Sequence, residues 1–224
     1  RKIKELGSSV SMSTSDEGID MRMHVWKREA LIILMETILK KKLKKIKLIE
    51  IGAASGIVSI MLAKWAKKKN IVFKAYCVEP NFSNVNFLQK TASKNNFDIR
   101  IFPVAVNQTQ KWTAFEEVEN YGTKGHVGDA ILNKDNQIFK FSLAIKDIIA
   151  AGFEPNIIYI DALLNESLIL DKLLDENFSS ASILVEFDYG VPDNIIDKCN
   201  DLNYHIKKID NEHYLLLKNE DKND

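Results

Sequence analysis

Four acidic residues are the best candidates for chemistry in this sequence, because each closes a short apolar run: Glu50, Glu79, Asp161 and Glu186. Runs of this length, rich in β-branched residues, are typical of strands buried on both faces of a parallel sheet. The carboxyl ends of parallel strands meet at one edge of the sheet, where ligands bind, so we expect the four carboxylates to converge there. An edge lined in this way favours a polyhydroxylated or cationic ligand over a phosphate-rich one.

The first of these runs leads into a turn that contains two glycines. Leu48 to Ile51 is followed by Gly52, Ala53, Ala54, Ser55 and Gly56, and a helical pattern starts at Ile57. A strand, a tight glycine turn and a helix form the opening unit of a doubly wound α/β domain. Glycine would let a ligand approach the backbone, and the helix would offer its free N–H groups. The alternative is an ordinary turn that required glycine.

Two nucleotide-type cofactors suit a glycine turn followed by an acidic second strand. A dinucleotide fingerprint requires glycine where Ala54 and Ile57 stand, so it fits poorly. S-adenosylmethionine fits better, because its ribose diol can donate two hydrogen bonds to a carboxylate such as Glu79. Its ammonium and sulfonium groups favour an acidic edge that includes Glu50, and it has no phosphate that would need a cradle.

Three stretches of the sequence resemble class I S-adenosylmethionine-dependent methyltransferases, and more closely the FkbM family. They are Leu48 to Gly56, Val78-Glu79-Pro80-Asn81, and Pro103-Val104-Ala105-Val106. The resemblance covers about Lys47 to Leu217. It implies O-methylation of a hydroxyl, often on a sugar or a secondary metabolite, so the expected partner is a small-molecule or glycan acceptor. It also implies cofactor contacts from Glu50, Gly52, Ala53, Ala54, Ser55, Gly56, Glu79, Pro80, Asn81, Val104 and Ala105.

The sequence departs from the FkbM pattern on the acceptor side. The family's strand ends in Lys-x-Asp-x-Glu-Gly-x-Glu, whereas this chain has Tyr159-Ile160-Asp161-Ala162-Leu163-Leu164-Asn165-Glu166. The resemblance therefore supports cofactor binding by this chain more strongly than it supports the family's substrate or its catalytic residues. Asp161 is the first candidate for the general base or for orienting the acceptor, and its alternative role is to cap the next helix. His126, in a glycine-rich loop, and Glu166 are the further catalytic candidates, and a solvated loop side chain is the alternative for His126.

The apolar patterns predict an α/β fold: a Rossmann-like, doubly wound, mostly parallel seven-stranded sheet with a C-terminal antiparallel hairpin strand. The third strand is expected at 99–106. Residues 1–46 form an N-terminal extension, with a polar arm that is either disordered or a lid, and an amphipathic helix at 26–42. On the resemblance above, residues 47–219 are expected to form the methyltransferase domain, with an inserted β-hairpin or small antiparallel patch at about 110–142, and 220–224 are expected to form a frayed tail.

Composition excludes several classes of protein. The 224 residues are 46% hydrophobic, and 31 basic residues balance 31 acidic ones, so no overall charge favours nucleic acid. No apolar run approaches the ~20 residues that span a bilayer, and no secretory signal opens the chain, which begins at Arg1. Cys77 and Cys199 have neither metal-site nor disulfide spacing, so we expect buried thiols, no metal and a cytoplasmic location. The lysines at 40–47 indicate a solvated helix end or, alternatively, a phosphate or acidic-lipid patch.

Two rival functions stay open beside methyl transfer. One is an NAD-dependent oxidoreductase. The other is a methyltransferase-like domain that binds a partner without transferring methyl groups, which the altered residues after Asp161 keep open. The sequence leaves undetermined the acceptor, the general base and the oligomeric state.

Overall fold

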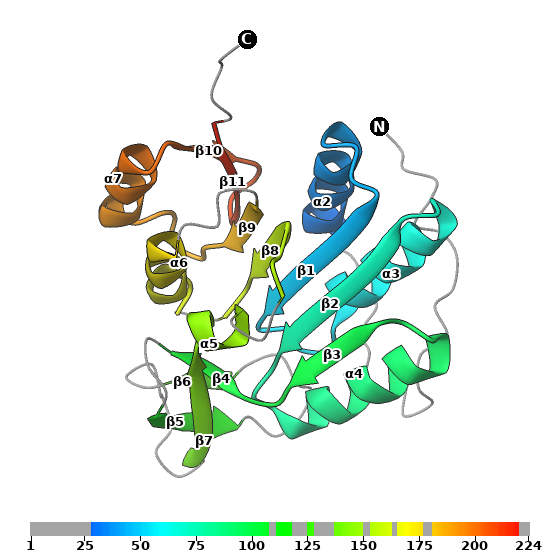
Figure 1. The fold of residues 1–224 in the computed structure, drawn as a ribbon. Coiled ribbons are helices and arrows are strands. Elements are labelled where there is room, and N and C mark those ends of the chain that lie inside the picture. Colours follow the sequence, from blue (N-terminus) through cyan, green and yellow to red (C-terminus); the bar gives the residue numbers. More distant parts are fainter. Residues whose placement is uncertain are drawn as a thin grey trace.

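The computed structural model of the chain describes residues 28–107, 111–117, 125–127, 137–149, 153–162, 165–176 and 181–219. Its centre is a twisted sheet with helices on both faces (Figure 1). The N-terminal arm (1–23) and the tail (220–224) lie outside the described residues, so the predictions for them stay predictions. Among the described residues, every helix is too short or too polar to cross a membrane.

The main sheet has seven strands in the order β10-β11-β9-β8-β1-β2-β3. Their bounds are β1 Lys45–Ile51, β2 Val72–Val78, β3 Ile99–Phe102, β8 Ile157–Ile160, β9 Ser182–Glu186, β10 Tyr204–Lys208 and β11 His213–Lys218. Pairing is parallel from β9 to β3, whereas β11 runs antiparallel to β9 and β10. The predicted fold class is therefore confirmed. The order reverses between β1 and β8, and the carboxyl ends of the strands at such a reversal are where open α/β sheets generally bind ligands.

Two hydrophobic cores cover the two faces of this sheet. One core joins α2 (Arg28–Lys40), α3 (Ile57–Lys68) and the inner side of α4 (Phe82–Asn95); the other joins α5 (Ile145–Ile149), α6 (Glu166–Asp175) and α7 (Asp193–Asp201). Strand β1 contributes to both, because side chains alternate between faces along a strand. Ile46 and Leu48 lie in the first core, and Ile49 and Ile51 in the second.

The segment predicted as a third strand, 99–106, is divided. Pro103 lacks an N–H for the ladder, and the chain leaves the main sheet there. β3 ends at Phe102, and β4 (Ala105–Asn107) belongs to a second sheet. This sheet, in the order β4-β7-β5-β6, also contains β5 (Lys111–Glu117), β6 (Gly125–Val127) and β7 (Gln137–Ala144). Among the described residues the insertion is thus a four-stranded, mostly antiparallel sheet, closer to the predicted antiparallel patch than to a hairpin, and it lies below the carboxyl ends of the main strands in Figure 1.

Other local predictions agree with the structure. The described part of the amphipathic helix is α2, and the C-terminal hairpin is formed by β10 and β11 around Asp210 to Glu212. Cys77 and Cys199 are both buried free thiols, as expected.

Candidate functional site

The turn between β1 and α3 is held by hydrogen bonds within the chain. The amides of Gly52 and Ala53 both donate to the Val78 carbonyl, at 3.0 and 3.1 Å, and the Gly56 amide donates to Ala53 at 2.6 Å. Gly52 has φ of +75°, and a Cβ there would lie 1.8 Å from the carbonyl oxygen of Asp161. The first glycine is therefore required by the close approach of two backbones, at the exits of β1 and β8.

The second glycine of the turn packs against a helix. Gly56 has φ of +73°, and a Cβ there would lie 2.2 Å from a methyl carbon of Leu88 in α4. Ala54 also has a positive φ, 46°, which costs a non-glycine residue energy unless its surroundings hold it. Those surroundings include the carboxylate of Glu79, which accepts a hydrogen bond from the Ala54 amide at 2.8 Å.

Glu79 lies directly after β2 and is 6% exposed. Its Oε2 accepts from the Ala54 amide, and its Oε1 accepts from the Asn81 amide at 2.8 Å and from Asn84 Nδ2 at 3.2 Å. A carboxylate oxygen can accept two hydrogen bonds, so among the described residues Oε2 keeps one acceptor position and Oε1 has filled both. Glu79 therefore shapes the turn and retains one position for a ligand hydroxyl.

Burial raises the pKa of Glu79, and the negative charge of Asp161 acts in the same direction, against the three hydrogen bonds that stabilise the ionised form. A further negative group beside this carboxylate would be repelled. A hydroxyl donor or a cation would be attracted.

Glu50 points away from the strand tip and into the first turn of α3. It is 1% exposed, and its Oε2 accepts from the Ser59 amide at 3.1 Å and from the Ser59 hydroxyl. Cys77 Sγ donates to the same oxygen at 3.7 Å, and burial together with the Glu50 charge raises the pKa of this thiol. The cap residue of α3, Gly56, has no side chain, so Glu50 supplies the cap from the neighbouring strand.

The remaining predicted cofactor residues lie in three places: Ser55 in the β1–α3 turn, Pro80 and Asn81 after β2, and Val104 and Ala105 after β3. Asn81 caps α4, because its Oδ1 accepts from the amides of Ser83 and Asn84 at 2.9 and 3.2 Å. Ala105 is buried in β4, whereas Pro80, Val104 and Ser55 are half-buried. A hollow of about 530 Å³ lies between α4 and β3, and Pro103 is among the residues that line it.

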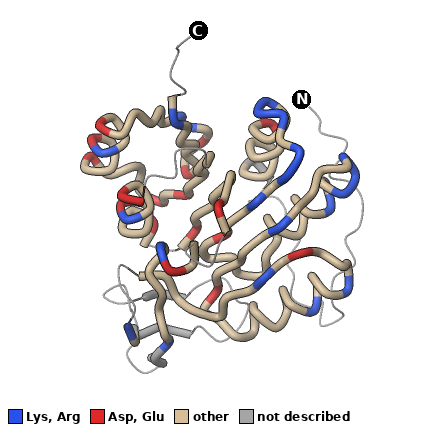
Figure 2. The backbone as a smooth tube through the Cα atoms, in the orientation of Figure 1, with Lys and Arg blue, Asp and Glu red and all other residues tan. Residues whose placement is uncertain are grey.

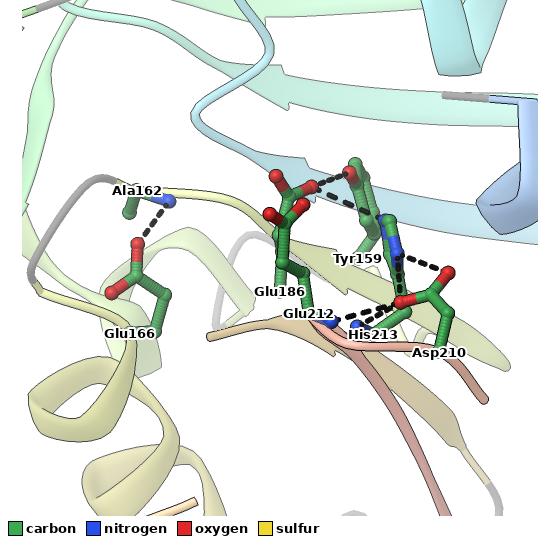
Figure 3. A network of polar contacts seen from close by, with 7 residues as sticks. All are labelled: Tyr159, Ala162, Glu166, Glu186, Asp210, Glu212 and His213. Atoms are coloured by element: carbon green, nitrogen blue, oxygen red, sulfur yellow. Dashed lines mark hydrogen bonds and ion pairs between the residues drawn. The ribbon is translucent and has the colours of Figure 1, made fainter. Parts of the chain in front are cut away.

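Asp161 and Glu166, two of the predicted catalytic residues, are brought together at the exit of β8. The Asp161 amide donates to Ile51 at 3.0 Å, which fixes it at the exit of β8. Glu166 begins α6, and its Oε1 accepts from the Ala162 amide at 3.1 Å (Figure 3). Burial, followed by the charges of Asp161 and Asp188, raises the pKa of Glu166 to about 7. A carboxyl group that titrates there is suited to general base catalysis near neutral pH. His126 lies in β6, opposite Glu116, and its side chain is outside the described part of the structure.

A second polar network on this side was not predicted from the sequence. Tyr159 donates to Glu186 Oε2 at 3.0 Å, and His213 Nε2 lies 3.3 Å from the same oxygen (Figure 3). His213 Nδ1 lies 2.9 Å from Asp210 Oδ2, on the other side of the ring. Burial lowers the pKa of His213, but the two carboxylates outweigh burial and raise it overall. The sequence feature that could have indicated this network is the Asp-x-x-His turn from Asp210 to His213, which leads into a strand that pairs with Glu186.

No family model matches the sequence, and no curated protein matches it. Solved structures do match its fold. The methyltransferase FkbM from Methylobacillus flagellatus has a TM-score of 0.51 at 16% identity, over 77% of this chain and 44% of that protein. A methyltransferase from Podospora anserina, PaMTH1, crystallised with S-adenosylhomocysteine, has a TM-score of 0.50 at 8% identity, over 85% of this chain and 78% of that protein. A point mutant of MtNAS, in complex with S-adenosylmethionine, has a TM-score of 0.50 at 11% identity, over 88% of this chain and 64% of that protein.

These similarities establish the fold class. The chain has a Rossmann-like α/β fold, which it shares with the two methyltransferases above, and β11 is the antiparallel strand of its main sheet among the described residues. It spans less than half the length of the FkbM protein that it matches.

Proposed function

We propose that the chain is an S-adenosylmethionine-dependent methyltransferase that methylates a hydroxyl of a small-molecule or glycan acceptor. The observation that carries this proposal is the position of Glu79. Its buried carboxylate lies 2.8 Å from the Ala54 amide, inside the turn where a dinucleotide fold would hold a pyrophosphate. A phosphate there would meet a negative charge. A nucleoside with a ribose diol and a cationic tail is the better match.

The hydrogen bonds of the turn support the same choice. The amides of Gly52, Ala53 and Ala54 are all used within the chain. A phosphate cradle needs such amides to point at the ligand, so the rival NAD-binding function is disfavoured. Bound S-adenosylmethionine would supply an electrophilic methyl group on a sulfonium. Glu79 would accept a ribose hydroxyl through the remaining position of Oε2, beside Pro80, Val104 and Ala105. The contact expected from Glu50 would have to compete with its bonds to Ser59.

The acceptor would be activated by Asp161 and Glu166. In the proposed direct displacement, bound S-adenosylmethionine would supply its methyl group to the acceptor oxygen and would leave as the neutral thioether S-adenosylhomocysteine. The hydroxyl proton passes to a carboxylate, for which Glu166 has the suitable pKa, about 7, while Asp161 orients the acceptor. Proton removal of this kind contributes roughly 10²–10⁴-fold, and alignment of the two reactants contributes more, up to ~7–11 kcal/mol.

Calorimetric titration with S-adenosylhomocysteine tests the cofactor assignment. Glu79→Ala should weaken binding at least about tenfold, the effect of losing one or two hydrogen bonds to a charged group. Glu186→Gln is the matched control, because it removes a carboxylate from the same edge on the acceptor side and should leave the affinity unchanged. A heat of binding with NAD but not with S-adenosylhomocysteine would overturn the proposal. Equal affinities of the wild type and Glu79→Ala for S-adenosylhomocysteine would overturn it as well.

The acceptor assignment has its own test. Mass spectrometry of hydroxylated metabolites incubated with the protein and cofactor should find a methylated product. Asp161→Asn and Glu166→Gln should reduce turnover while leaving the affinity for S-adenosylhomocysteine intact. Cofactor binding without turnover on any acceptor would instead favour the non-catalytic binding domain.

A further inference from the structure

The lysines of this chain are concentrated at one end of the main sheet. Residues 37–78 contain eleven lysines and one acidic residue, Glu50, which is buried at the opposite end of β1. Exposed members of this group lie at the end of α2, the start of β1 and the end of α3. We call them the basic edge: Lys40, Lys41, Lys42, Lys44, Lys45, Lys67, Lys68 and Lys69. Figure 2 shows them gathered at the ends of these elements, away from the carboxyl ends of the strands.

The charge of the basic edge is weakly compensated. Among the described residues, Lys41, Lys44, Lys45 and Lys67 form no ion pair, whereas Lys172 and Lys198 in α6 and α7 are paired with aspartates. Burial and then the positive charge of Lys68 lower the pKa of Lys64, one helical turn away. Three exposed acids lie near this edge and are outnumbered by the eight lysines: Glu36, one helical turn before Lys40 in α2, and Asp98 and Glu154, which precede β3 and β8. The chain is neutral overall, so this end is positive because the charges are segregated.

Two aliphatic side chains are exposed among these lysines. Leu39, in the last turn of α2, is 54% exposed, and Val72, at the start of β2, is 60% exposed. Val72 is paired in register with Lys45, and its amide donates to the Lys44 carbonyl at 3.1 Å. The Lys42 amide donates to the Leu39 carbonyl at 3.1 Å. Each exposed aliphatic residue thus has lysines beside it.

We propose that the basic edge, with Leu39 and Val72, is a docking surface for an anionic membrane. Lysines attract a surface of acidic lipids, and aliphatic side chains between them can enter the interface. Single-stranded nucleic acid is the weaker match, because the grooves that bind it rely on exposed aromatic residues for base stacking and on arginines, and duplex DNA is distinguished by the aliphatic residues, which it would not use. Residues 37–78 contain no arginine, and the large hydrophobic side chains exposed there are aliphatic.

The location of this surface leaves the candidate site accessible. The basic edge lies at the amino ends of β1 and β2, whereas Glu79, Asp161 and Glu186 follow the carboxyl ends of their strands. A chain docked through the basic edge would present the opposite end of the sheet to the aqueous phase. Docking would therefore place the protein at a membrane without covering the carboxyl ends of the strands.

Co-sedimentation of the full chain with vesicles tests the proposal. We expect binding to vesicles of phosphatidylcholine and phosphatidylglycerol, little binding to phosphatidylcholine alone, and release by added salt. The combined variant Lys41→Glu, Lys44→Glu, Lys45→Glu and Lys67→Glu should lose at least about a hundredfold in partition, since each lysine near an anionic surface contributes about fivefold. The matched control reverses four exposed lysines elsewhere and should retain far more binding: Lys90, Lys111, Lys146 and Lys207. Thermal unfolding would verify that both variants are folded.

A second variant separates a membrane from a general polyanion. Leu39→Gln with Val72→Thr keeps every charge, so it should weaken vesicle binding severalfold and leave any binding to duplex DNA unchanged. The proposal is overturned if the basic-edge variant and its charge-matched control lose vesicle binding equally. It is also overturned if the aliphatic variant binds vesicles as well as the wild type does, or if the protein binds duplex DNA more tightly than anionic vesicles. These outcomes do not depend on the methyltransferase assignment.

Discussion

Glu166→Gln gives a direct test of the electrostatics on the acceptor side. The pKa of Glu166 rises from 4.5 to about 7 on folding, mainly because the carboxyl is buried and 8% exposed. A raised pKa means that the folded state holds the proton more tightly than the unfolded state. Between these two values each pH unit lowers the free energy of unfolding by about 1.4 kcal/mol, a total of about 3 kcal/mol. This stability is fully present below pH 4.5 and is lost as pH rises through 7.

In Glu166→Gln, the amide oxygen of glutamine can still accept the hydrogen bond from the Ala162 amide, but the side chain cannot ionise. Urea denaturation across this pH range should therefore show wild-type stability falling more steeply than that of Glu166→Gln. The difference between the two proteins should grow to about 3 kcal/mol on the alkaline side. Parallel curves would refute the reasoning, because they would mean that Glu166 titrates alike in the folded and unfolded chain.

Gly52→Ala should destabilise the fold by at least about 3 kcal/mol, because its Cβ would meet the Asp161 backbone at 1.8 Å; Gly190→Ala, with φ of +85° but its nearest atom 3.7 Å away, should cost only about 1 kcal/mol. Equal losses in urea denaturation would contradict the proposed contact. Ser59→Ala should cost about 1–3 kcal/mol, since it removes the hydroxyl bonded to a buried carboxylate, and an unchanged denaturation midpoint would argue against that cap. His213→Gln should remove stability that is fully present below pH 6.5 and is lost as pH rises through the raised folded pKa, so a pH profile identical to wild type would count against the charged pair.

The order of the elements could be read from the sequence because their hydrophobic periods are unambiguous. Four apolar runs formed β1, β2, β8 and β9. Glu79, Asp161 and Glu186 lie at the carboxyl ends of β2, β8 and β9, whereas Glu50 turns away from that edge and bonds Ser59 in α3. The alternation of side chains between the two faces of β1 also indicates which way Glu50 points. Glu50 is separated by an even number of residues from Ile46 and Leu48, so it lies on the same face of the strand, which packs against α3. Its carboxylate could therefore have been predicted to contact that helix rather than a ligand at the end of the strand.

Other features depend on contacts between distant segments and could not be predicted. The close approach of Gly52 to Asp161 joins the exits of two strands that are far apart in sequence. Likewise, Tyr159, Glu186 and His213 meet only because β8, β9 and β11 are neighbours in the sheet. The departure of the chain from the sheet after Phe102 was signalled by Pro103, but the apolar residues on both sides concealed it.

The internal bonding of the β1–α3 turn has a consequence for ligand entry. Because Val78 and Glu79 already accept from its amides, the turn keeps its shape without help from a ligand. A nucleoside that enters would then lose its own freedom of motion but would not have to immobilise the turn as well. Hydrogen exchange at Gly52, Ala53 and Ala54 should accordingly be slow in the free protein, and saturation with S-adenosylhomocysteine should slow it little further.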